Sequence, residues 1–141
     1  RGVTIRTNGR PALAAADGIV AIRVENDGLW EVKIEHPASF MGTRYLVRSV
    51  YQGLSDLTVD IGQKVRRGDE IGRSELLTFG AVFHQGVGFD QHVRLPVFWR
   101  TRAGRVECYN PAKRSSSDFP NESVYSGNTV SFTYPASCGP D

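Results

Sequence analysis

The segment that most constrains the fold is the glycine-punctuated stretch over residues 57–72. Its apolar residues recur at short intervals and glycines separate them (Val59, Ile61, Val65 and Ile71; Gly62, Gly68 and Gly72). Glycine adopts the backbone angles that tight turns need, so the pattern predicts two short strands around a tight turn. A similar unit lies upstream, in residues 9–20 followed by residues 30–36. Units of this kind build small β-sandwiches and barrels.

Alternation of apolar and polar residues continues through the first ~112 residues. It predicts further strands over residues 3–7, 18–24, 29–35, 45–51, 79–83 and 93–99. The sequence Asn26-Asp27-Gly28 between two of them is a hairpin signal. The one weak helix candidate is residues 74–77. Many short strands with glycine turns indicate an all-β fold, an antiparallel sandwich or a barrel-sandwich hybrid.

The alternation of apolar and polar residues ends near residue 112, and this change predicts the domain organisation. We expect one β domain over residues 1–112 and a loop-rich extension over residues 113–141, in which residues 130–134 are a strand candidate. A length of 141 residues suits one domain with an extension. The net charge of +2 gives no strong attraction to nucleic acid. No apolar run is long enough for a membrane-spanning helix, so we expect no membrane insertion by this chain.

The two cysteines, Cys108 and Cys138, predict a disulfide that ties the extension to the last strand of the β domain. In the chain-entropy model such a bridge stabilises a fold by about 3 to 4 kcal/mol. A disulfide implies an oxidising compartment, the periplasm or the exterior. The alternative is two buried free thiols in a reducing compartment.

Five motifs in order resemble the lysostaphin-like (LytM-type) metallopeptidase domain, which has a duplicated hybrid motif fold. They are residues 9–20 (Gly-Arg-Pro-Ala-Leu-Ala-Ala-Ala-Asp-Gly-Ile-Val), 33–36 (Lys-Ile-Glu-His), 51–55 (Tyr-Gln-Gly-Leu-Ser), 59–72 (the glycine-punctuated segment) and 92–97 (His-Val-Arg-Leu-Pro-Val). The resemblance covers residues 1 to ~112. It implies the fold of that family, whose members are zinc endopeptidases that cut peptidoglycan cross-bridges.

The resemblance also implies a zinc site, and this sequence departs from it at most positions. The family binds zinc through a His-x-x-x-Asp motif and the second His of His-x-His, while the His of Tyr-x-His serves catalysis. Here Thr4 stands at the Asp position, Gly53 at the His of Tyr-x-His and Arg94 at the last ligand, and only His92 matches. Threonine is a poor zinc ligand and arginine repels a cation, so we expect no catalytic residues and no cofactor.

We therefore expect a catalytically inactive LytM-like domain that is a binding or regulatory module of the cell envelope, periplasmic or extracellular. Its partner would be peptidoglycan peptide or a cell-wall hydrolase that it activates. Tyr51, His92 and Arg94 are the expected binding residues of the former substrate groove. Arginine suits an acidic ligand, because its planar fork of donors matches a carboxylate. Alternatively, Arg94 pairs with Asp90 inside the domain.

Two rival functions use other features of the chain. One is a zinc-dependent peptidoglycan endopeptidase with a relocated metal site made of His84, Asp90 and His92. The other is a structural component of an envelope or secretion assembly, with the extension and sheet edges as contact surfaces. The remaining histidine, His36, lies on an alternating strand and is interpreted as structural.

Overall fold

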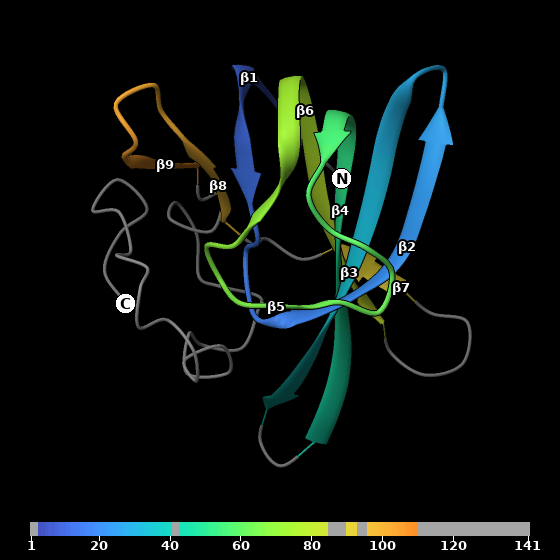
Figure 1. Ribbon diagram of the computed structural model, residues 1–141. Helices are drawn as coiled ribbons and strands as arrows, with labels where there is room; N and C mark the ends of the chain where they lie inside the picture. The colour runs from blue at the N-terminus through green and yellow to red at the C-terminus, as the bar shows by residue number, and fades with distance from the viewer. Residues whose placement is uncertain (1–2, 41–42, 85–89, 93–95, 110–141) are drawn as a thin grey trace.

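The computed structural model describes residues 3–40, 43–84, 90–92 and 96–109 of the chain. These residues form the strands β1 Val3–Leu13, β2 Gly18–Asn26, β3 Leu29–Phe40, β4 Thr43–Leu57, β5 Lys64–Val65, β6 Glu70–His84, β7 Asp90–His92, β8 Val97–Arg100 and β9 Val106–Tyr109 (Figure 1). No helix occurs among them, so no described helix could cross a membrane. The weak helix expected at residues 74–77 is wrong, because these residues lie inside β6.

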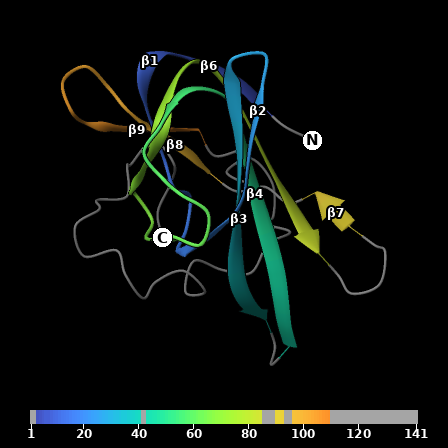
Figure 2. The same ribbon diagram turned by 45° about the vertical axis from the view of Figure 1, so that its right-hand side comes forward.

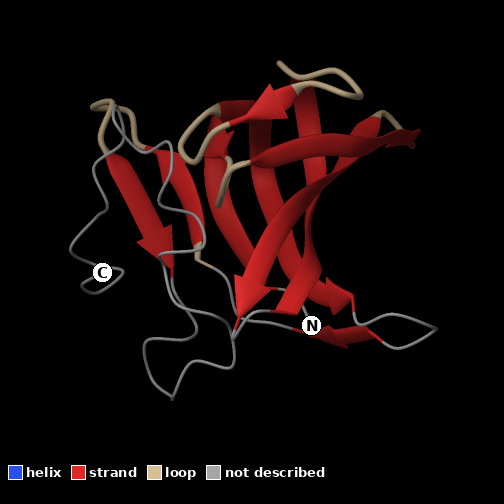
Figure 3. Cartoon of the chain, turned by 90° about the horizontal axis from the view of Figure 1, so that it is seen from below, coloured by secondary structure: helices blue, strands red, loops and turns tan. Residues whose placement is uncertain are grey.

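The strands form one sheet in the order β5-β2-β3-β4-β6-β1-β8-β9, with β7 paired to β6 outside this order, and every pairing between described strands is antiparallel. The sheet curls into a half-barrel, as the view from below shows (Figure 3). The predicted all-β antiparallel fold is confirmed. The described strands form one continuous curled sheet and not two stacked ones. The long strands β4 and β6, of 15 residues each, follow the curve of this sheet.

Bulges explain how such long strands can bend. The β4–β6 register shifts between Gln52 and Leu54 and again between Leu54 and Asp56, and the β1–β6 register shifts between Arg6 and Arg10. A bulge kinks its strand and increases the local twist, so the sheet wraps around a single core. Gly53 lies inside the first of these shifts, with a φ of 86°.

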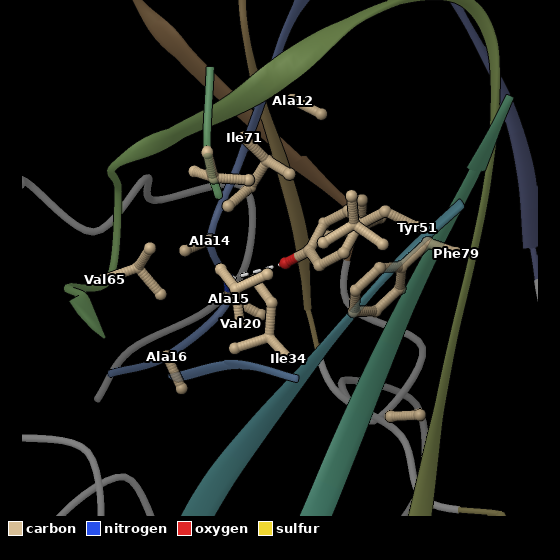
Figure 4. Packing of buried hydrophobic residues seen from close by; sticks show 14 of the residues in the cluster. Ala12, Ala14, Ala15, Ala16, Val20, Ile34, Tyr51, Val65, Ile71 and Phe79 are labelled. Atoms are coloured by element: carbon tan, nitrogen blue, oxygen red, sulfur yellow. Dashed lines mark hydrogen bonds between the residues drawn. The ribbon is translucent and has the colours of Figure 1, made fainter. Parts of the chain in front are cut away.

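The core lies in the concavity of the sheet, where four alanines leave room for one large ring (Figure 4). Ala12, Ala14, Ala15 and Ala16 are all buried, and the ring of Tyr51 is fully buried beside them. The Tyr51 hydroxyl accepts a hydrogen bond from the Ala15 backbone N–H at 2.8 Å and donates one to the Leu13 carbonyl at 3.2 Å. The small side chains and the satisfied hydroxyl together let the phenol be buried without an unpaired polar group.

The predicted glycine turns are confirmed at Gly28, Gly62 and Gly68, whereas Gly72 lies inside β6 and forms no turn. Asp27 and Gly28, with φ of 54° and 81°, form a two-residue connection between β2 and β3, which the type I′ hairpin geometry requires. Gly62 and Gly68 also have positive φ, and the Gly62 N–H donates to the Val20 carbonyl at 2.8 Å. The glycine-punctuated segment therefore packs against the upstream unit through backbone hydrogen bonds.

The C-terminal part of β3 and the N-terminal part of β4 extend beyond the curled part of the sheet. Figures 1 and 2 show the ends of β3 and β4 as a two-stranded arm. The β3–β4 pairing continues to Phe40 and Thr43, whereas β4 pairs with β6 only as far as Leu46. The short strand β7 pairs with β6 near this end.

The predicted extension over residues 113–141 lies outside the described residues, so the domain boundary stays a prediction. Cys108 is on β9, half-buried against the small cluster of Leu13 and Phe98. Its predicted partner, Cys138, also lies outside the described residues, and the disulfide stays a prediction.

Candidate functional site

The residues expected at the former metal centre map to the face of the sheet that points away from the core, which we call the outer face. One row of it crosses β3, β4, β6 and β1, because Glu31 is opposite Gln52, Gln52 opposite Thr78, and Thr78 opposite Thr4. Thr4 is exposed, and its hydroxyl lies 3.1 Å from the Thr78 hydroxyl. The position that carries the aspartate ligand in the resemblance is thus occupied by a neutral hydroxyl pair.

Gly53 stands where the resemblance places a catalytic histidine, and its backbone is shaped for glycine. Its φ of +86° is in the left-handed region, which L side chains rarely adopt. A Cβ added there would lie 2.5 Å from the Leu76 carbonyl oxygen. The Gly53 carbonyl also accepts a hydrogen bond from the Ser74 hydroxyl at 2.7 Å, which holds the bulge in place. A histidine at this position therefore requires a different backbone.

A second hydrogen bond continues this bracing on the far side of β6. Thr7 is buried, and its hydroxyl donates to the Ser74 carbonyl at 2.6 Å. Residues of β1, β6 and β4 are thus joined through Thr7, Ser74 and Gly53 across the curl. The bulge is a built part of the sheet and not a local irregularity at its edge.

His92 lies away from Thr4 along the same edge of β6. The strand β7 continues the line of β1 along that edge, with His92 opposite Val82 and Thr4 opposite Thr78. Four residues of strand span about 13 Å. Since zinc ligands lie about 2 Å from the metal, Thr4 and His92 are not brought to one metal ion.

The three residues of the relocated metal site are close in register. His84 is directly opposite Asp90, and His92 follows Asp90 by two residues. Directly opposed residues and residues two apart on a strand occupy positions of one face. The backbone thus brings this trio together, whereas Arg94 lies outside the described residues.

Tyr51 lies in the core and does not reach the outer face. Its exposed fraction is 0% and its hydroxyl is engaged by Ala15 and Leu13, as described above. Burial raises the pKa of the Tyr51 phenol well above its usual range. Tyr51 therefore packs in the core beneath the sheet and stabilises the fold, and its side chain is not available to a ligand on the outer face.

His36 is buried in a polar network, consistent with the structural interpretation. Its Nδ1 lies 2.8 Å from the Asp17 carbonyl oxygen, and its Nε2 lies 2.7 Å from the Ser49 hydroxyl. Burial lowers the pKa of His36 to about 4, so the ring is neutral near pH 7. A neutral ring that donates from Nδ1 and accepts at Nε2 satisfies both contacts. Gly18 makes room for it, because a Cβ there would lie 2.7 Å from Nδ1.

The outer face also carries a set of paired charges that the sequence reasoning missed. The Lys33 ammonium lies 3.6 Å from the Glu31 carboxylate, and the Arg48 guanidinium lies 2.7 Å from that of Glu35. The Gln52 amide donates to Glu31 at 2.9 Å. The alternation of charged residues at 31, 33 and 35 was the available signal, since residues two apart on a strand share a face.

At two positions of the zinc centre implied by the resemblance, the described residues are Thr4 and Gly53, and neither carries a usual zinc ligand or a catalytic base. A catalytic zinc ion needs three nitrogen, oxygen or sulfur ligands and an open position. Among the residues whose side chains the structure describes, which do not include His84, Asp90 and His92, no group of three or more His, Cys, Asp or Glu residues could hold a metal ion. At the implied positions the described part of the chain offers the Thr4 hydroxyl and a glycine.

A curled antiparallel sheet with glycine-turn units is the architecture expected of a domain of the metallopeptidase type. The family model of peptidase family M23 matches residues 1–90, and the chain belongs to that family. The resemblance to the LytM-type domain is thereby confirmed over these residues. No curated protein matches the sequence.

Proposed function

We propose that this chain is a catalytically inactive M23 domain that acts as a binding or regulatory module of the cell envelope. It would bind peptidoglycan peptides or dock onto and activate a cell-wall hydrolase. The observation that carries the proposal is the backbone at Gly53, where the position of a catalytic histidine is closed to any side chain.

The chemistry of the other positions supports the same conclusion. The Thr4 hydroxyl is a weak metal ligand and already lies within hydrogen-bond distance of Thr78. The family mechanism needs a metal-bound water and a group that handles its proton. Without an acidic ligand at Thr4 or a histidine at Gly53, the described residues supply neither. What the M23 scaffold keeps is an exposed sheet face that a peptide can lie on.

The test measures metal content, cleavage and binding on the same protein. After dialysis we expect substoichiometric zinc, and we expect no release of soluble fragments from dye-labelled peptidoglycan sacculi. In parallel, the protein should co-sediment with unlabelled sacculi or raise the rate of a cell-wall hydrolase. Cleavage that is lost on metal chelation would overturn the inactive assignment. Absence of both binding and activation would overturn the modular role.

A second candidate function is a zinc endopeptidase with a relocated site, favoured by the β6–β7 register. His84, Asp90 and His92 occupy neighbouring positions of one face there. This candidate predicts one tightly held zinc per chain that is lost in His92→Ala, and cleavage that depends on it. His36→Gln is no suitable control, because His36 is buried in the core. Asp60→Asn, an exposed carboxylate elsewhere on the chain, should leave the zinc content unchanged.

The compartment and the contact surfaces belong to the same proposal. The proposed disulfide between Cys108 and Cys138 requires an oxidising environment, and peptidoglycan lies in one. A purely structural role in an envelope or secretion assembly would use the sheet edges or the extension. Such a role predicts a stable protein complex and no affinity for sacculi.

A further inference from the structure

Arg6 is an outer-face cation that has no ion pair with any side chain the structure describes. Lys33 and Arg48 are compensated by Glu31 and Glu35. Arg6, on β1, is exposed and forms no ion pair within the described ranges. It stands two residues from Thr4 on the same strand, so both occupy the outer face. Arg6 therefore places on this face a positive charge that no described carboxylate pairs with.

An exposed apolar side chain lies directly beside this arginine. Leu76 of β6 is opposite Arg6 in the register, and its exposed fraction is 47%. Opposed side chains in an antiparallel pair have Cβ atoms about 5 Å apart. On the other flank of Leu76, Gly53 contributes no side chain, since its bulge leaves no room for one. The same backbone feature that removes the catalytic histidine thus leaves Leu76 uncovered.

Neutral hydrogen-bonding groups complete the surroundings. Thr78 lies two residues from Leu76 on β6, and its hydroxyl lies 3.1 Å from that of Thr4. Gln52 is opposite Thr78 on β4 and is exposed. The patch formed by Arg6, Leu76, Thr78, Thr4 and Gln52 therefore combines one cation, one apolar contact and several neutral polar groups.

We propose that this Arg6–Leu76 patch binds the free carboxylate of a short peptide that has a small apolar side chain next to it. Arginine presents a planar fork of donors that matches a carboxylate with two parallel hydrogen bonds. Leu76 packs against the neighbouring apolar side chain and shields the ion pair from water, which strengthens it. The inference rests on the proposed binding role of the domain and names the chemistry of its ligand.

The probe is acetyl-Ala-Ala with a free C-terminal carboxylate, compared with the same dipeptide as its C-terminal amide. Titration followed by amide NMR should shift residues of β1 and β6 around Arg6 and Leu76 with the acid only. Affinity for the acid should fall as salt is added, because an exposed ion pair is screened. Equal shifts with acid and amide, or no binding of the acid at millimolar concentration, would overturn the proposal.

Three variants test separately the positive charge of Arg6, the planar shape of its guanidinium and the effect of removing an arginine elsewhere. Arg6→Gln should weaken binding of the acid about five- to tenfold, the range for one partly shielded charged hydrogen-bonded pair. Arg6→Lys should recover only part of it, because an ammonium lacks the fork. Arg66→Gln, at another exposed arginine in the turn after β5, is the matched control and should bind as the unaltered protein does. An Arg66→Gln effect equal to that of Arg6→Gln would contradict the assigned position.

Co-sedimentation with sacculi keeps this inference distinct from the proposed function. If both the unaltered protein and Arg6→Gln sediment with sacculi to the same extent and the dipeptide acid does not bind, the patch is excluded while the binding role stands. If the dipeptide acid binds at Arg6 but the protein neither sediments nor activates a hydrolase, the patch stands and the envelope role falls.

Discussion

Replacement of Gly53 by alanine should destabilise the fold much more than the same replacement at Gly28. Both glycines have left-handed backbone angles, with φ of +86° and +81°. That conformation costs an L-residue about 1 to 2 kcal/mol. An added Cβ meets nothing within 4 Å at Gly28, whereas at Gly53 it lies 2.5 Å from the Leu76 carbonyl oxygen. The two variants therefore share the conformational cost and differ in the steric one.

The two variants should differ in their free energy of unfolding by the steric cost at Gly53. Gly28→Ala should lower the free energy of unfolding by about 1 to 2 kcal/mol. Gly53→Ala adds the cost of forcing atoms into filled space, about 1 to 3 kcal/mol, for a total of about 2 to 5 kcal/mol. Urea unfolding at pH 7 measures both, and an unchanged m-value shows that the change is in stability.

The outcome that would refute this reasoning is a Gly53→Ala stability within about 0.5 kcal/mol of Gly28→Ala, the usual scatter of surface substitutions. The bulge would then accept a side chain, and the main support for an inactive domain would be lost. Gly53→His in the same assay should be at least as destabilising as Gly53→Ala, because its first side-chain atom meets the same carbonyl.

Three further predictions concern the core and the cysteines. Since burial lowers the pKa of His36 to about 4, below its unfolded value of about 6.5, stability should be constant above pH ~6.5. It should then fall by about 3 kcal/mol in all as the pH drops to 4, seen as a shift of the urea midpoint that is reduced in His36→Gln. Tyr51→Phe leaves the buried Ala15 N–H without its acceptor and should cost about 1 to 3 kcal/mol in urea unfolding, whereas a loss below 0.5 kcal/mol would contradict the bond. Mass spectrometry without reductant should show the two-hydrogen deficit of a Cys108–Cys138 disulfide, and two alkylatable thiols in the native protein would exclude it.

Local turn chemistry was readable from the sequence because it depends on few residues. Asp27-Gly28 could be placed as a two-residue turn, since both positions need positive φ and few residues adopt it. Gly62 followed from the same argument. The curl of the sheet could not be predicted in this way, because an alternating pattern does not show whether a strand ends or bends at a bulge. Strands β4 and β6 were therefore expected as short segments of a sandwich and proved to be continuous.

The site was predictable in its positions but not in which face each position occupies. Tyr51 was expected in the groove because it is part of the Tyr-x-His pattern, yet the strand places it in the core. The exposed residue of that segment is its neighbour Gln52. Arg6 and Leu76 carried no motif at all. Their proximity comes from the β1–β6 register, which pairs residues 70 positions apart and has no local signature in the sequence.

In the proposed function, the bulge at Gly53 accounts both for the missing catalytic histidine and for the exposed surface beside it. The Ser74 hydroxyl of β6 donates to the Gly53 carbonyl, and the Thr7 hydroxyl of β1 in turn donates to the Ser74 carbonyl, so these two strands hold this conformation. A histidine at Gly53 therefore requires the backbone to shift, whereas Thr4 is exposed and an aspartate at that position meets no such obstacle. The same closed backbone keeps Leu76 open beside Arg6. The proposed binding of an acidic peptide would therefore use the same stretch of backbone at which a catalytic histidine would need a different conformation.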